Sequence, residues 1–460
     1  MGGCKRYNSV AETVAVDESE RETTLWATKR RYAVYSNCAG RPHEAYATQR
    51  STDGNDRHHR APTRTEDSGT ALSRGHWRDR CTEDTRIVRA MTGRIYSIDS
   101  MRIVAMVFVV AIHTDPFRGL GVYGNVANFV IDSAARFVVP FFFMTAGYFF
   151  ARKTTRRNLT DYFSKRATTI VSLYAFGLAL AAPVFLAGTV LRTGAENGDI
   201  VSSSSHRLAE FVSPAALLYY GNSISEILWF LPALLFSFAF VYVFVRADKT
   251  TYLLPISLGF HIVGLLGTSY TMFVDVPFEV RDALFFGFFY TSLGYAISVR
   301  DWQPTAARSP LYLGLTLLFG VFHLGERYVL GYVVGGETFA QGVYTSSYTI
   351  GTALFTVSLF VFLLSRPTLG SSTPVPSWGN YAVGIYVTHP AVLYVLQRTA
   401  EALHLAGYEI RETIWWHLVL TPATFFGALF VYIAVQRVGT TEIGSTALSR
   451  LRSSRHRDPE

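Results

Sequence analysis

Apolar runs separated by short polar segments fill the chain between residues 95 and 437. A helix that crosses roughly 30 Å of hydrocarbon needs about 20 mostly apolar residues, so runs of this length predict membrane-spanning helices. Eight runs are predicted as spans on this basis. They are Ala167–Leu191, Ile227–Val245, Thr250–Val274, Ala283–Val299, Ser309–Gly325, Ser346–Ser365, Gly379–Gln397 and Thr413–Gln436.

Two earlier runs, Ile103–Thr114 and Phe137–Ala151, are shorter and have charged neighbours. They can cross a bilayer only if these charges lie within the helix near its ends, where long side chains reach the interface. Basic residues follow every second run, whereas the intervening segments hold fewer of them and several acidic residues. Omitting either short run would place the basic segment 152–166 on the wrong side of the membrane.

The pattern therefore predicts an all-α protein, a polytopic integral membrane bundle of about ten transmembrane helices with both termini cytoplasmic and no soluble catalytic domain. The bundle occupies residues 91–437, and residues 438–460 form a basic cytoplasmic tail. Residues 1–90 are polar and without periodicity, so we expect a disordered hydrophilic extension. Met91 directly precedes the first predicted helix and is an alternative translation start.

Composition supports a membrane protein. Charged residues make up 17% of the chain, whereas a soluble domain has about 25%. The net charge of +8 could suit a nucleic-acid-binding protein, but the basic residues cluster between apolar runs. This clustering is typical of membrane topology signals, so we expect a lipid bilayer as partner and no nucleic acid. All three cysteines precede residue 91, which excludes a disulfide or a cysteine metal site from the apolar region, and we predict no metal site.

The first predicted helix carries Arg102 and His113, which are eleven residues apart. Eleven residues make about three helical turns, so both side chains share one face, about 16 Å apart along the axis. Asp99 lies on nearly the same face. Ionisable groups inside a membrane usually face a cavity or the bundle interior. The stripe is either a catalytic site, with His113 as general base and Arg102 binding phosphate, or a snorkelling Arg102 with a helix-packing His113.

Other polar residues extend this hypothesis. His389 lies about 15 Å into its helix, at a depth similar to that of His113, while Glu326 lies nearer the outer end of its own helix. Either residue could line a shared polar cavity, or simply form hydrogen bonds between helices. The basic segment is a topology determinant or a phosphate site for a nucleotide-bearing donor. Its candidate substrate-binding residues are Arg152, Arg156, Lys165 and Arg166.

Four segments resemble the acyltransferase 3 family, whose members are membrane O-acyltransferases that modify sugars and related acceptors. Ser97–His113 resembles the family opening, in which Asp-x-x-Arg is followed by ten residues and His. Val139–Gly147 resembles Pro-x-Phe-Phe-x-x-Ser-Gly, although Ala146 replaces the serine. Leu228–Leu231 resembles Leu-Trp-Phe-Leu and adds Trp229 to the candidate binding residues. Gly379–Pro390 resembles the late motif that ends in Tyr-x-x-His-Pro.

The resemblance implies transfer of an acyl group, with acetyl favoured, from acyl-CoA to a hydroxyl of a sugar or other cell-surface acceptor. It assigns catalytic roles to His113, Arg102 and Asp99. Acyl-CoA would be a donor substrate, and no permanently bound cofactor is expected. The expected location is the plasma membrane, as a multi-pass protein. Two alternatives stay open, namely a transporter or exporter of a glycan or lipid precursor, and a sensory or scaffolding membrane protein.

Overall fold

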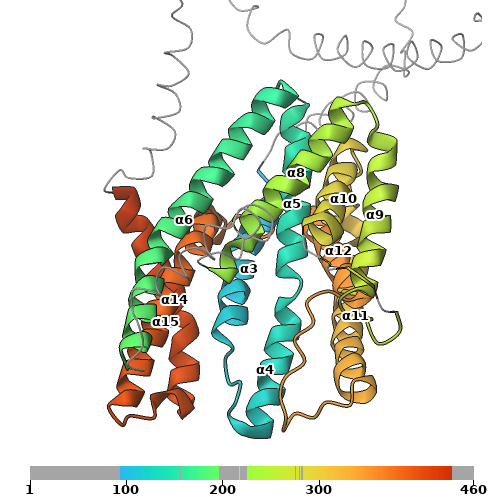
Figure 1. Ribbon diagram of the computed structural model, residues 1–460. Coiled ribbons are helices and arrows are strands. Elements are labelled where there is room, and N and C mark those ends of the chain that lie inside the picture. The colour runs from blue at the N-terminus through green and yellow to red at the C-terminus, as the bar shows by residue number, and fades with distance from the viewer. Residues whose placement is uncertain are drawn as a thin grey trace, which may run out of the picture. The chain divides into compact units, whose positions relative to one another are not determined.

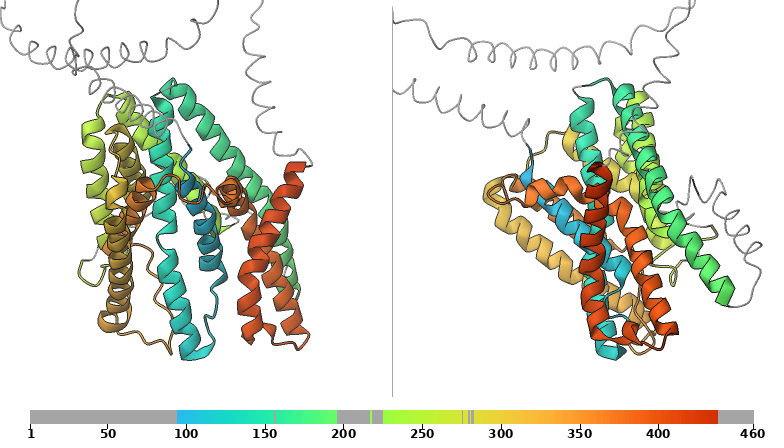
Figure 2. Two further views of the ribbon diagram at one scale, coloured as in Figure 1. Left: turned by 180° about the vertical axis from the view of Figure 1, so that it is seen from behind. Right: turned by 90° about the vertical axis from the view of Figure 1, so that its left-hand side faces the viewer.

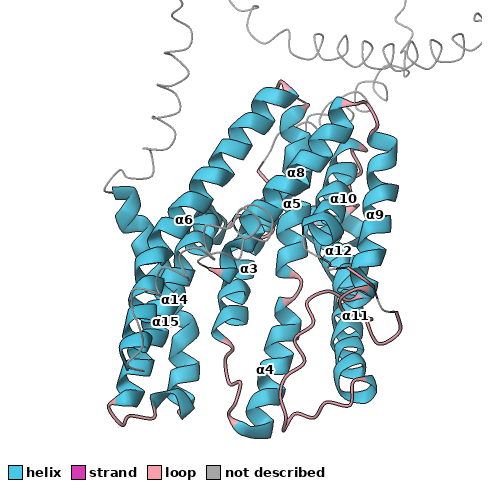
Figure 3. Cartoon of the chain, viewed as in Figure 1, coloured by secondary structure: helices cyan, strands magenta, loops and turns pink. Residues whose placement is uncertain are grey.

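The computed structural model describes residues 94–155, 157–195, 217, 225–274, 276–278, 280 and 283–437. Within these ranges the chain forms helices joined by loops and turns (Figure 3). The predicted extension, residues 1–90, and the predicted tail, residues 438–460, lie outside the described residues.

The long helices follow the predicted apolar runs, except for Gly121–Ala135, which lies between the first two of these runs. The long helices are α3 (Tyr96–Thr114), α4 (Gly121–Ala135), α5 (Val138–Thr154), α6 (Leu159–Ala195), α8 (Phe230–Arg246), α9 (Thr250–Leu266), α10 (Phe288–Val299), α11 (Ser309–Tyr328), α12 (Ile350–Ser365), α14 (Ala382–Leu405) and α15 (Ile414–Arg437). Short helices lie between or beside them. They are η2 (Glu226–Trp229), η3 (Ala283–Gly287), η4 (Ala306–Arg308), η5 (Val329–Val334), α13 (Val375–Trp378), η6 (Gly379–Tyr381) and η7 (Ile410–Glu412).

The all-helical prediction is confirmed for the described residues. Six helical segments among them are long and apolar enough to cross a membrane, and three further apolar helices, within 250–266, 283–299 and 350–365, are shorter. Each predicted run contains a helix. The total of ten spans and the cytoplasmic position of both termini remain predictions.

The charges beside the second predicted run lie where two helices meet. We predicted Asp132 and Arg136 just before the span Phe137–Ala151, and Arg136 lies between the end of α4 and the start of α5 at Val138. Helix α4 was not among the predicted runs, and together with α5 it forms one apolar segment, Gly121–Thr154. The two charged residues are tolerated inside the bundle because Asp132 pairs with both Arg136 and Arg327.

Helix α3 is one of the most buried helices of the bundle. In its apolar window 56% of the residues are buried, close to the 61% for Gly121–Thr154 and well above the 17% for Leu159–Gly188 and the 22% for Ile414–Arg437. Helices α6, α14 and α15 lie together on one side of α3, while α5 and α8 to α12 lie on the other (Figures 1 and 2). Charged residues on α3 are therefore in the interior, whereas the exposed apolar faces of α6 and α15 suit contact with lipid.

Helices α5 and α10 pack closely because glycine lies at both contact points. A Cβ atom on Gly147 would lie 1.9 Å from the carbonyl oxygen of Thr291, and one on Gly294 would lie 2.0 Å from that of Met144. Both distances are far below van der Waals contact, and both neighbours are backbone atoms. Small residues at such points let membrane helices approach closely.

We expect Gly147→Ala to destabilise the protein by about 1–3 kcal/mol, because the two backbones must move apart. Gly314→Ala is the matched control, since a Cβ atom there would meet nothing within 4 Å. Thermal unfolding in detergent should show a lower midpoint for Gly147→Ala only. Equal midpoints for the two variants would contradict the proposed close contact.

Candidate functional site

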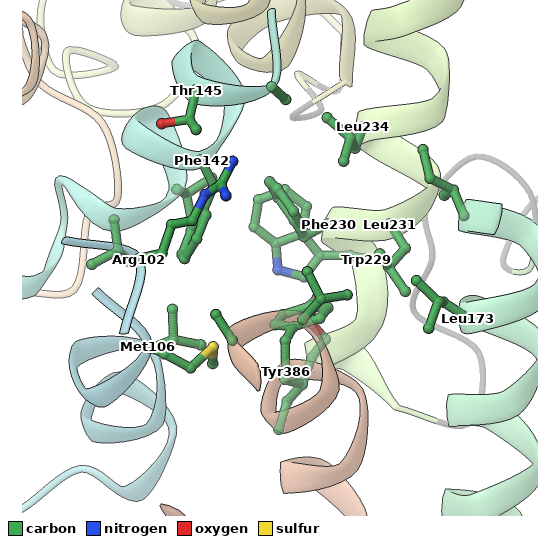
Figure 4. A pocket seen from close by; sticks show the side chains of 18 of the residues that line it. Arg102, Met106, Phe142, Thr145, Leu173, Trp229, Phe230, Leu231, Leu234 and Tyr386 are labelled. Atoms are coloured by element: carbon green, nitrogen blue, oxygen red, sulfur yellow. The ribbon is translucent and has the colours of Figure 1, made fainter. Parts of the chain in front are cut away.

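A cavity of about 590 Å³ lies beside α3, lined mainly by residues of α3, α5, α6, α8 and α14. Figure 4 shows Trp229 and Phe230 facing it from the start of α8, with Tyr386 contributed by α14. Most of its lining side chains are apolar. The charged and imidazole groups on its wall are Arg102, His113, Arg136 and Arg166.

Helix α3 contributes one stripe to this wall. Arg102, Met106, Val109 and His113 all line the cavity, at spacings of four, three and four residues that follow the helical period. The prediction that Arg102 and His113 share a face is confirmed. They mark two ends of the stripe, about 16 Å apart.

Arg102 and Arg166 together form one end of the cavity. The Nη1 atom of Arg102 lies 3.1 Å from Oδ1 of Asp99, and its guanidinium lies 5.1 Å from the ring centroid of Phe149. Arg166, from α6, donates from Nε to the hydroxyl of Tyr162 at 3.1 Å. Asp99 does not line the cavity. It also accepts a hydrogen bond from Arg94, so it fixes two arginines rather than contacting a ligand directly.

The imidazoles of His113 and His389 are neighbours, with ring centroids 5.6 Å apart. Their predicted similar depth is therefore confirmed. Nδ1 of His389 lies 2.7 Å from the carbonyl oxygen of Tyr386. Because a carbonyl oxygen can only accept, Nδ1 carries the proton and Nε2 presents a lone pair. Nε2 is buried and has no partner among the described residues, which leaves it available to accept a hydrogen bond.

A third arginine, Arg136, lines the cavity and interacts electrostatically with His113. It lies at the break between α4 and α5. Pro140 explains the break, since proline has no N–H to donate to the carbonyl group of residue 136. The Arg136 side chain is paired with Asp132 through Nε at 3.0 Å and Nη2 at 2.7 Å. Its Nη1 donates to the hydroxyl of Ser347 at 2.9 Å.

Only some of the predicted substrate-binding residues line the cavity. Arg166 and Trp229 line the cavity, and His389 adjoins it through His113. Arg156 lies outside the described residues. Three others do not line this cavity, namely Arg152, Lys165 and Glu326.

The three residues that do not line the cavity have other surroundings. Arg152 packs over the Tyr148 ring, and Lys165 is exposed. Glu326 accepts hydrogen bonds from the Tyr270 hydroxyl and from the backbone N–H of Gly351 at 2.7 Å. It therefore satisfies an N–H at the start of α12. The geometry gives Glu326 a structural role, and no substrate role is proposed for it.

Several cavity residues were not among the sequence candidates, above all Arg136 and Ser347. Arg136 had a detectable signal, since a charge inside an apolar segment usually faces the bundle interior. Ser347 had none, because it enters the site from the segment before α12. Among the described residues, no group of three or more His, Cys, Asp or Glu side chains is placed to hold a metal ion.

A family model described as an acyltransferase domain, Acyl_transf_3, matches residues 95–433. The chain belongs to the acyltransferase 3 family. The match includes the α3 stripe, the Arg136 region and His389. Membership of this family, together with the long apolar helices, supports acyltransferase activity in a membrane.

Two curated relatives, both named amino-acid racemase and both from Enterococcus faecalis, are similar to parts of the chain. One is 25% identical over 236 residues, covering 48% of this chain and 30% of the relative. The other is 24% identical over 319 residues, covering 66% of this chain and 42% of the relative. The chain thus spans less than half of either relative. No solved structure matches it significantly.

Proposed function

We propose that this acyltransferase 3 protein moves an acyl group, with acetyl favoured, from acyl-CoA to a hydroxyl of a sugar or other cell-surface acceptor. One observation carries the proposal: a single cavity is lined by two arginines at one end and by His113 farther along the same helix face. Guanidinium groups suit phosphates, and imidazole suits removal of a proton from a hydroxyl near neutral pH.

The donor would bind with its phosphates at Arg102 and Arg166. The largely apolar wall between these residues and His113 suits the pantetheine arm, which would carry the thioester toward the imidazole. Asp99 would be a positioning residue, because its carboxylate holds the Arg102 guanidinium by a charge-assisted hydrogen bond.

His113 would act as general base. As its imidazole takes the proton of the acceptor hydroxyl, the hydroxyl oxygen attacks the thioester carbonyl carbon. The C–S bond then breaks, and the leaving thiolate takes the proton from the imidazolium. The lone pair on Nε2 of His389 could accept a hydrogen bond from His113 and steady its protonated form.

The donor site is tested by measuring CoA binding to the purified full chain in lipid nanodiscs. We expect Arg166→Gln to weaken binding by about tenfold or more, since a hydrogen bond to a charged group contributes about 1.5–3 kcal/mol. Lys165→Gln is the matched control, because Lys165 is adjacent in sequence but does not line the cavity. Equal weakening in both variants, or in neither, would count against a donor site at Arg166.

The transporter alternative makes a different prediction. A transporter would move its substrate chemically unchanged across the membrane. An acyltransferase leaves a new ester on the acceptor, so chemical analysis of the product separates the two functions.

A further inference from the structure

The cavity carries a cation that the mechanism above does not use. Arg136 lines the wall together with His113, and its side chain is 13% exposed. Contacts to Asp132 and Ser347 fix its guanidinium in one orientation. Nη1 has two N–H groups. Ser347 takes one of them, and the other has no hydrogen-bond partner among the described residues.

The charge around Arg136 is not balanced. Asp132 is shared, since Oδ2 also lies 2.7 Å from Nη2 of Arg327. The Arg327 side chain is fully buried between the rings of Phe129 and Tyr344, and its Nε and Nη1 atoms have no hydrogen-bond partner in the described part of the chain. One carboxylate therefore serves two guanidinium groups. An uncompensated charge in a membrane interior is costly.

The neighbouring polar groups do not supply the missing anion. Glu326 directs its carboxylate to the Tyr270 hydroxyl and the N–H of Gly351. The Nε2 atom of His323 lies 3.1 Å from the carbonyl oxygen of Ser133, so this nitrogen must donate. The cluster of Asp132, Arg136 and Arg327 thus keeps an excess of one positive charge, and Arg136 is its member on the cavity wall.

We propose that Arg136 binds a carboxylate of the acceptor, so that the protein acylates a hydroxyl of a carboxylate-bearing molecule such as a sugar acid. One monovalent anion matches the single excess charge, and Arg136, which has a spare N–H, lines the cavity. Arg102, about 16 Å along α3 from His113, and Arg166 on α6 remain available for the donor. The inference rests on the acyl transfer at His113 proposed above.

Three probes that differ at one carbon test the inference. They are methyl β-D-glucuronide, its neutral methyl ester, and methyl β-D-glucoside, titrated calorimetrically against the full chain in nanodiscs. We expect the glucuronide to bind about tenfold or more tightly than both neutral probes, because its carboxylate forms a charge-assisted hydrogen bond with Arg136.

Arg136→Gln should abolish this preference while leaving CoA binding within about twofold, which also shows that the variant is folded. The matched control is Arg118→Gln, since Arg118 pairs with Asp115 at an exposed position and does not line the cavity. It should keep the preference. If Arg136→Gln fails to fold, Arg136→Lys serves instead and should keep a reduced preference, because the charge remains and the planar geometry is lost.

Equal binding of the three probes, failure of the glucuronide to bind, or a preference that survives in Arg136→Gln would each overturn the inference. Failure of the underlying function has a different signature. In that case the glucuronide binds through Arg136, yet no label moves to it from labelled acetyl-CoA. Transfer of label to neutral acceptors in preference to the glucuronide would support acyl transfer and reject the carboxylate.

Discussion

Replacing His113 by alanine is expected to reduce acyl transfer by about 10²–10⁴-fold, the usual contribution of a general base. The cause would be loss of the group that takes the hydroxyl proton, so donor binding at Arg102 and Arg166 should change little. The measurement is steady-state transfer of labelled acetyl by the purified protein, with CoA binding measured in parallel. His113→Gln, which keeps polarity but cannot act as a base near neutral pH, should be equally impaired.

The matched control is His261→Phe. His261 is also buried within a helix of the bundle, but it does not line the cavity and stacks on Phe289 with ring centroids 4.4 Å apart. Phenylalanine keeps this aromatic packing, so the rate should stay within about twofold of the original. If His113→Ala kept the full rate, or if His261→Phe lost as much activity, His113 would not be the base.

The second large effect concerns stability. Asp132→Asn should destabilise the bundle by about 3–5 kcal/mol, because it leaves the fully buried Arg327 and the largely buried Arg136 without a carboxylate. The control Asp115→Asn should cost less than about 1 kcal/mol. That carboxylate pairs with Arg118 at a position where both side chains are more than 40% exposed. Equilibrium unfolding in mixed detergent micelles gives both values.

A double variant separates charge imbalance from lost packing. Asp132→Asn with Arg327→Gln has the same excess charge as the original cluster, whereas Asp132→Asn alone adds one further positive charge. The double variant should therefore be more stable than the single one. If it were less stable, the effect of Asp132 would arise from shape or from specific hydrogen bonds and not from charge balance.

Local sequence patterns predicted the helices and the α3 stripe. Apolar length located eight of the predicted runs, because lipid imposes a minimum span, and charge alternation added two shorter ones. Helix α4 was missed, since it lies between those two shorter runs. The helical period placed Arg102 and His113 on one face, since both belong to one rigid element. Depth along two helices brought His389 to the same level as His113, and their contact bears this out. These inferences needed only distances measured along single helices.

The rest depends on contacts between distant parts of the chain. Arg136 meets Ser347, which is 211 residues away, and Asp132 meets Arg327, which is 195 residues away. No local pattern specifies such pairs. Glu326 was a cavity candidate because it is an ionisable group within a predicted span, but the start of α12 lies beside it and the N–H of Gly351 binds its carboxylate. A sequence can therefore identify buried charges, while the packing of other elements decides which of them face a ligand.

The central claim is that one cavity transfers an acyl group from CoA to a hydroxyl by means of His113. The most direct test adds acetyl-CoA, labelled in the acetyl group, to membranes that contain the original protein or His113→Ala, and follows the label. The account predicts label in an alkali-labile ester on a glycan or other acceptor with the original protein, and background label with His113→Ala. Equal label in both membranes, or no ester with a protein that binds CoA, would contradict it.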